Sequence, residues 1–143
     1  MAAITYRTFI DGLEALTVAG ITKRYTQGPP PVLQTANLPA QWVRTPGRVA
    51  AATTEIGLAF TGAGLDVKFR ADLVVAVEAT GQSLQFANFD AMVTMVDSVA
   101  AALRSDAAHI LATGSPTWEI GYEIMAVGDI LYHAVVAAVE VIA

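Results

Sequence analysis

The stretch Val67–Glu78, with the sequence V-K-F-R-A-D-L-V-V-A-V-E, has the clearest periodicity in the chain. Its apolar and charged residues alternate, so that one side would carry Val67, Phe69, Ala71, Leu73, Val75 and Val77, and the other Lys68, Arg70, Asp72 and Glu78. A period of two residues is typical of a β-strand with one face in the core. Because a slip of one residue would bury the four charges, we expect a firmly fixed register.

Two amphipathic helices are predicted, one on each side of this strand in the sequence. Over residues 5–18, apolar residues follow the i, i+3, i+4, i+7 spacing of one helical face, with Thr5 as the N-cap and Gly20 as a stop signal. Over residues 89–104, a second apolar stripe follows Asn88, whose side chain suits an N-cap. Both helices should pack one face against a sheet.

Four further segments have the composition of β-strands. Ile21–Thr26 alternates apolar and polar residues, and Ala40–Arg44 is a short run of strand formers. Near the C-terminus, Trp118–Val127 and Ile130–Val141 are predicted to form a hairpin around the dipeptide Gly128–Asp129, which suits a tight turn.

The segment between Arg48 and Leu65 has a weaker pattern of small residues and threonine. We interpret it as a long hairpin or mobile loop, with a strand over Glu55–Phe60 and a turn at Gly62–Gly64. The order of a helix, two or three strands, a helix and two strands lacks the alternation of a parallel doubly wound sheet. The sequence therefore predicts an α+β fold, a single domain over residues 1–143 in which two helices cover one face of a mainly antiparallel sheet.

The composition favours a domain that associates with other proteins. Of the 143 residues, 55% are apolar and 15% are charged, which is more apolar than a usual soluble monomer. We therefore expect partners to cover part of the surface. The net charge of −5 argues against a nucleic-acid-binding protein, because phosphate recognition needs clustered basic side chains.

No segment has the pattern of an export signal or a membrane anchor. The opening residues MAAITYRTFIDGLEAL lack the basic segment and apolar run of a secretory signal. The apolar run Ile130–Val139 is bracketed by Asp129 and Glu140, well short of the roughly 20 residues that a membrane helix needs. We expect neither export nor a membrane partner.

The sequence has no pattern of a catalytic, cofactor or metal site. It has no cysteine, and His109 and His133 lack a second ligand at i+3 or i+4, so we interpret both as capping or packing residues. Glu119 and Glu123 would share one side of a strand about 13 Å apart, which favours a solvated or interface-facing edge over an acid–base pair. We predict that the chain is not an enzyme and has no cofactor, with a carboxylate-only enzyme as the least favoured function.

Several residues are candidates for protein–protein contacts, although each also has a simpler interpretation as a turn or core residue. Trp42 and Arg44 are chosen because we expect them to be exposed on a strand, and Phe60 because glycines flank its loop. Three consecutive prolines are predicted to form a stiff surface loop: Pro29, Pro30 and Pro31. Trp118 has the same two interpretations as Trp42, since large aromatic residues are common both in cores and in interfaces.

Four segments that together span nearly the whole chain have a familiar order. They are the helix ITYRTFIDGLEAL, the run AGITKRYTQGPPPV followed by the strand LPAQWV, the strand FRADLVVAVEAT followed by the helix FDAMVTMVDSVAAALRSD, and the hairpin WEIGYEIMAVGDILYHAVVAAVEVIA. This order of element types resembles the tail terminator family among the small neck and tail-completion proteins of long-tailed bacteriophages.

The resemblance implies a structural virion protein, assembled in the host cytoplasm, whose copies form a ring that is typically a hexamer. Such a ring ends the finished tail tube and joins it to the head connector, so the implied partners are the major tail tube protein and the head–tail connector protein. Two alternatives stay open at this point. One is another head–tail completion protein, and the other is a small-ligand or regulatory binding module with its pocket between the helix over 89–104 and the sheet.

Overall fold

The computed structural model describes residues 5–45, 47–50, 53–56, 59–63, 66–80, 89–105 and 116–142 of the chain. Its helical elements are α1 (Tyr6–Glu14), the short 3-10 helix η1 (Thr35–Asn37) and α2 (Phe89–Ser105). Its strands are β1 (Lys23–Arg24), β2 (Ala40–Arg44), β3 (Gly47–Ala50), β4 (Thr53–Ile56), β5 (Ala59–Ala63), β6 (Asp66–Ala79), β7 (Pro116–Val127) and β8 (Ile130–Ile142).

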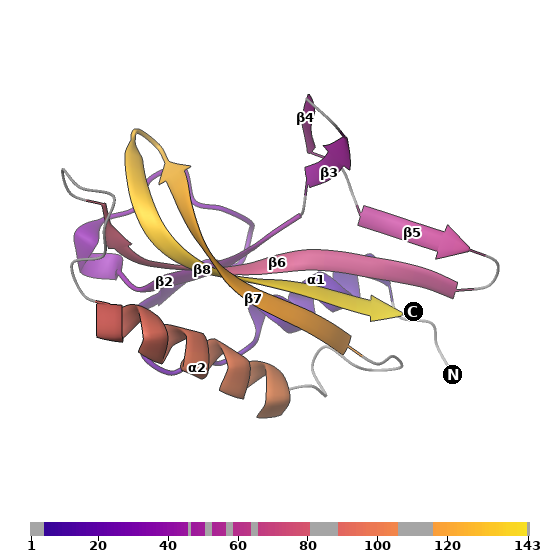
Figure 1. Cartoon of the computed structure of the whole chain (residues 1–143), viewed down its shortest axis with the longest axis horizontal. Coiled ribbons are helices and arrows are strands. Elements are labelled where there is room, and N and C mark those ends of the chain that lie inside the picture. The colour runs from indigo at the N-terminus through magenta and orange to yellow at the C-terminus, as the bar shows by residue number, and fades with distance from the viewer. Residues whose placement is uncertain are drawn as a thin grey trace.

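Six of these strands form one twisted sheet in the order β1-β2-β6-β8-β7 (Figure 1), and β5 pairs with the first half of β6 on the same side as β2. The β1–β2 pair is parallel and the other pairs are antiparallel, so the sheet is mixed. The strands β3 and β4 form a separate two-stranded sheet. The predicted α+β class is confirmed.

The larger core lies between the sheet and both helices. From α1 and α2 it takes Phe9, Leu13, Met92, Met95, Val99, Ala102 and Leu103, and from β6 and β8 it takes Phe69, Ala71, Leu73, Val75, Val77, Val135, Ala137, Val139 and Val141. The members from β6 are those that the alternating pattern placed on one side of that strand. The prediction that two helices pack on one face of the sheet is therefore confirmed.

A second, smaller core covers the opposite face of the sheet. Its buried members are Leu33, Ala40, Trp42, Val74, Ala76, Val127, Tyr132 and Ala134. The chain between β1 and β2 crosses this face, and the hydroxyl of Tyr132 donates a hydrogen bond of 3.2 Å to the carbonyl oxygen of Leu33. The middle of β6 is consequently buried on both faces, whereas its alternating sequence predicted burial on one face only.

The first helix begins where predicted and ends earlier. The side chain of Thr5 accepts a hydrogen bond of 3.1 Å from the backbone N–H of Thr8, which confirms the N-cap. The helix ends at Glu14, not near residue 18, because side chains from the sheet bind the carbonyl groups beyond it. Arg24 donates to the carbonyl oxygens of Ala15 and Leu16, at 3.1 and 3.3 Å, and a cation at this position also interacts favourably with the helix dipole.

The other predicted elements are confirmed to different degrees. The predicted bounds of Ala40–Arg44 are those of β2, α2 ends one residue later than predicted, and the C-terminal hairpin turns at Gly128, which has a φ of +62°. The predicted strand Ile21–Thr26 is wrong in length, since only Lys23 and Arg24 pair with a neighbour. The N-cap predicted at Asn88 lies outside the described residues.

The described residues between Arg48 and Leu65 form strands and not a loop. They make up the β3–β4 hairpin and β5, so the hairpin interpretation is confirmed for the paired residues 47–50 and 53–56. The single strand predicted over Glu55–Phe60 is wrong, because β4 ends at Ile56 and β5 begins at Ala59. Gly62 pairs with Val67 inside β5, so it is not in a turn, and Gly64 lies outside the described residues.

Candidate functional site

The strand β7 forms one open edge of the sheet. It pairs with β8 from Pro116 to Val127 without a register shift, and none of the described residues pairs with its other side. Backbone N–H and C=O groups alternate in direction along a strand, so every second residue of β7 directs both groups toward this edge. A long, regular open edge is a template for pairing with another chain.

The side chains of β7 are also more exposed than those of the strands in the middle of the sheet. Only Val127 is buried among its residues. Trp118 and Ile120 pack partly against the larger core, while Tyr122 is 46% exposed. The Tyr122 hydroxyl lies 2.8 Å from Nδ1 of His133, whose ring is buried in β8 and partly stacked on the tyrosine ring. The edge strand therefore presents apolar and aromatic side chains that contact ordered neighbours.

A group of charged side chains lies on the face of the sheet opposite the helices. Arg44 forms ion pairs of 3.0 Å with Asp72 and 2.9 Å with Glu123, and so connects β2, β6 and β7. Burial alone would lower the pKa of the Arg44 guanidinium, but the hydrogen bonds and negative charges of Glu123 and Asp72 raise it above its ordinary value. Arg44 is therefore a fixed cation that ties the edge strand to the opposite side of the sheet.

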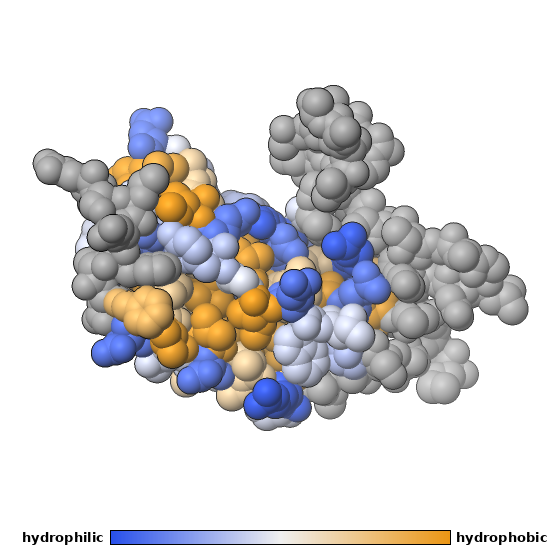
Figure 2. Space-filling model, viewed as in Figure 1, coloured by the Kyte–Doolittle hydropathy of each residue, from blue (hydrophilic) through white to orange (hydrophobic). Residues whose placement is uncertain are grey.

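Exposed apolar side chains extend from this edge over neighbouring elements. The large ones are Val32, Phe89, Val93, Tyr122, Ile130 and Leu131. Figure 2 shows apolar surface over α2 and over the tip of the β7–β8 hairpin. Exposed apolar patches of this kind are typical of protein–protein contacts.

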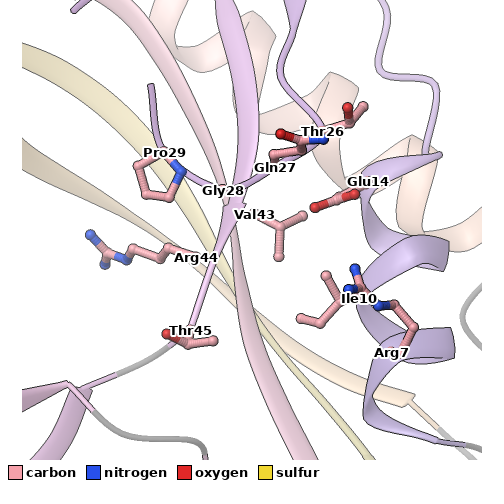
Figure 3. Close-up of a pocket in the computed structure, with 10 residues that line it drawn as sticks. All are labelled: Arg7, Ile10, Glu14, Thr26, Gln27, Gly28, Pro29, Val43, Arg44 and Thr45. Carbon is pink, nitrogen blue, oxygen red and sulfur yellow. The ribbon is translucent and has the colours of Figure 1, made fainter. Parts of the chain in front are cut away.

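The opposite edge of the sheet has a different shape and charge. The strand β1 ends after Lys23 and Arg24, both exposed, and the chain then turns away through residues 26–31. Beyond the end of β1, a cavity of about 470 Å³ lies between α1, the loop over 26–29 and the last residues of β2 (Figure 3). Val43 points toward α1 in this view and Arg44 points to the other side of the strand.

The charged lining of this cavity comes mainly from α1. Arg7 and Glu14 line it together with the polar side chains of Thr26, Gln27 and Thr45. Burial and the nearby negative charge of Asp11 raise the pKa of the Glu14 carboxyl, and the positive charge of Arg7 partly offsets this effect. The cavity is therefore open and lined by polar and apolar residues alike, with Arg7 and Glu14 contributing one cation and one carboxylate from the same helix.

The interface residues predicted from the sequence have different environments in the structure. Trp42 is 2% exposed and belongs to the smaller core, so the prediction that it is exposed on its strand is wrong. Arg44 is partly exposed but engaged by two carboxylates. Pro29 and Pro31 are exposed, as predicted for a surface loop, whereas Pro30 is buried. Phe60 pairs with Phe69 through β5, and its side chain lies outside the described part.

The sequence predicted that Glu119 and Glu123 lie at an edge, but it did not predict the opposite edge, which carries Lys23 and Arg24. Glu119 and Glu123 both lie in β7, the edge strand, in agreement with their interpretation as an edge. His133 is buried inside β8, in agreement with a packing role, and His109 lies outside the described residues. The signal for the second edge was the basic pair Lys23–Arg24 in a segment too short to be a central strand.

In comparisons with known proteins, no protein-family model matches the chain, and no match is found among curated proteins. Among the described residues, no helix has the length and apolarity needed to cross a membrane. The same part of the chain contains no group of three or more His, Cys, Asp or Glu side chains arranged to hold a metal ion.

Proposed function

We propose that the chain is a structural subunit of a long-tailed bacteriophage virion. Its copies form a ring, typically a hexamer, at the head-proximal end of the tail tube, where the ring ends the tail and joins it to the head connector. The work of this protein is done by protein–protein contacts, without turnover, cofactor or metal. It is assembled in the host cytoplasm and then resides in the tail or neck of the virion.

One observation supports the proposal most strongly: β7 is a long open edge with partly exposed apolar side chains. Proteins that stay monomeric usually protect such an edge with charged side chains, above all lysine, with proline or with a bulge. β7 carries two glutamates, Glu119 and Glu123, but no lysine; its one proline is its first residue, Pro116, and its pairing with β8 has no register shift. An edge of this kind favours a protein that adds strands or side chains of another subunit. That the subunit belongs to a phage tail is inferred from the order of elements, which resembles the tail terminator family.

The first test is the mass of the purified protein by light scattering, alone and mixed with tail tube or connector proteins. We expect a ring of several copies, alone or on the end of the tube. Contacts in an obligate assembly bury on the order of 2,000 Å² or more. A chain that stays monomeric in all three conditions would overturn the proposal.

A pair of variants tests whether the edge strand carries the assembly. Tyr122 in β7 and Val93 on α2 are 46% and 44% exposed, so lysine replaces a side chain of similar exposure in each case. We expect Tyr122→Lys to prevent assembly, because a lysine at an open edge opposes strand pairing, and Val93→Lys to have a smaller effect. The opposite ranking would place the contact on α2.

The cavity in Figure 3 favours a second candidate function, a small-ligand or regulatory binding module. Sequence reasoning placed such a pocket between the second helix and the sheet. The cavity lies instead beside α1, and α2 presses Met92, Met95 and Val99 into the core. This candidate predicts a stable monomer that polar small molecules stabilise against heat, and it predicts that Arg7→Ala abolishes that stabilisation while mass stays constant.

A further inference from the structure

The charges of the chain are unevenly divided between its two ends. Residues 5–45 contain four Lys or Arg and two Asp or Glu, whereas residues 116–142 contain four Asp or Glu and no Lys or Arg. The first segment supplies β1 and β2, and the second supplies β8 and β7. The two strands that end the sheet, β1 and β7, follow the same division: β1 carries Lys23 and Arg24 and no carboxylate, and β7 carries Glu119 and Glu123 and no Lys or Arg.

The basic edge presents positioned cations. Lys23 and Arg24 are both exposed, and none of the described residues pairs with the outer side of β1. The ammonium group of Lys23 lies 5.7 Å from the centre of the Tyr25 ring. Arg24 is held by its hydrogen bonds to the last carbonyl groups after α1. Both positive charges are therefore fixed close to an unpaired strand.

The basic edge also has space and an unused hydrogen-bond acceptor. A cavity of about 220 Å³ adjoins β1 and is lined by Thr22, Arg24 and Gln41 among other residues. Gln41 is 1% exposed, and its Nε2 donates to the carbonyl oxygen of Leu16 at 3.1 Å. Its Oε1 is buried and has no partner among the described residues. A buried acceptor without a donor is costly, but this oxygen lies beneath the surface, so what the edge offers to an incoming chain is the cavity and the two cations.

We propose that copies of the chain join head to tail through these two edges. The strand β7 of one copy lies along the β1 edge of the next, which brings Glu119 close to Lys23 and Arg24. The alternative contact, β7 antiparallel to β7 and centred on Gly121, would place Glu119 of each copy opposite Glu123 of the other, and facing like charges are destabilising. A head-to-tail contact uses different surfaces on each copy, and its repetition closes a ring when the rotation between neighbouring copies is a whole fraction of a turn.

This inference rests on the proposed ring, and it adds which surfaces meet and which charges select them. It is tested by exchanging the charges in Glu119→Lys and Lys23→Glu, both at exposed positions. Asp97→Lys and Arg104→Glu make the same charge changes on the exposed side of α2 and serve as matched controls. Glu123 and Arg24 are left intact, because they hold Arg44 and the end of α1.

We expect each exchange alone to raise the protein concentration needed for half-assembly by on the order of tenfold, because an attractive pair becomes a repulsive one. The two controls should assemble like the wild type. The double variant should recover the assembly, and so should a 1:1 mixture of the two single variants, in which every contact again pairs opposite charges. Recovery on mixing is a result that misfolded variants cannot give.

Two results separate the failure of this inference from the failure of the proposed function. If the wild type assembles but the exchanged variants assemble equally well, or do not recover on mixing, the head-to-tail contact is wrong and the ring stands. If Lys23→Glu changes nothing and Glu119→Lys, alone or mixed with the wild type, assembles more tightly than the wild type alone, β7 pairs with itself. A wild type that stays monomeric alone and with tube and connector proteins overturns both.

Discussion

Replacement of Arg44 by methionine should destabilise the folded chain more than its position near the end of a strand suggests. Methionine keeps most of the apolar stem of arginine but removes the charge that holds Asp72 and Glu123. The Asp72 side chain is 12% exposed and its partner is 3.0 Å away, so the variant leaves a nearly buried carboxylate without its cation. The Glu123 side chain is 42% exposed as a whole, although Oε2, the oxygen that Arg44 contacts, is buried.

The size of the effect follows from these two exposures. An acceptor left unpaired in a buried position costs about 1–3 kcal/mol, and an exposed ion pair contributes about 0.2–1 kcal/mol. Together they predict a loss of about 2–3 kcal/mol in the free energy of unfolding. At the size of this domain, 1 kcal/mol shifts Tm by about 4 °C, so we expect Arg44→Met to melt about 8–12 °C below the wild type.

Urea unfolding followed by circular dichroism measures this loss, at a concentration where the chain is monomeric. The matched control is Arg70→Met, which removes an ion pair of 3.5 Å whose partners, Arg70 and Glu140, are 46% and 33% exposed. That control should cost less than about 1 kcal/mol. The double variant Arg44→Met/Asp72→Asn should be more stable than Arg44→Met alone, because the unpaired charge is gone. Equal losses in Arg44→Met and Arg70→Met would refute the reasoning.

Three further changes test other parts of the structure. Trp42→Ala should cost about 3–5 kcal/mol in urea unfolding and clearly more than Trp118→Ala, because only Trp42 is fully buried. Gly128→Ala should lower Tm, with a cost of about 1–2 kcal/mol, because its φ is +62° and a Cβ would lie 3.2 Å from the carbonyl oxygen of Pro31. Glu14→Gln should stabilise the chain at pH 7 and have no effect near pH 3 in urea unfolding. The raised pKa of the Glu14 carboxyl means that the folded state favours its protonated form. Ionisation of Glu14 therefore destabilises the wild type as pH rises through that pKa, and glutamine does not ionise.

The parts of the fold that the sequence predicts well are those whose burial is set by local periodicity. The strand β6, the helix α2 and the β7–β8 hairpin each have a regular apolar pattern bounded by turn residues, and the structure reproduces their bounds within a few residues. The helix α1 has the same kind of pattern, but its end depends on Arg24 and Gln41, which reach it from the sheet. Distant contacts of this kind leave no local signal.

The same limit explains the error on Trp42. A short strand beside prolines has the pattern of an exposed edge, yet the chain after β1 crosses the sheet and places Leu33 over this face. The path of that crossing is set by the parallel pairing of Lys23 with Ala40, which brings together residues 17 positions apart. Pairing of two residues in β1 could not be deduced from periodicity, because two residues have no period.

The sequence showed which charged residues form the candidate site, but it did not show where they lie relative to one another. Glu119, Glu123 and Lys23–Arg24 are all visible in the sequence as charges within strand-like segments. That they lie on opposite edges of one sheet depends on the strand order, in which β1, the first strand of the chain, and β7, the last but one, are farthest apart. Arg44 shows the complementary case, since its partner Glu123 is distant in sequence and lies three strands away in the sheet.

The second core changes the meaning of the apolar composition. Sequence reasoning attributed the surplus of apolar residues to surfaces covered by partners, but part of that surplus fills the face of the sheet opposite the helices. The case for assembly therefore rests less on composition and more on the open edge of β7 and the apolar side chains beside it. Because both faces at the middle of the sheet are already covered, a partner can extend the sheet only at its edges. Substitutions that disrupt assembly without lowering stability should accordingly fall on β7, β1 and their exposed neighbours. Substitutions in either core should lower both the stability of the chain and its assembly.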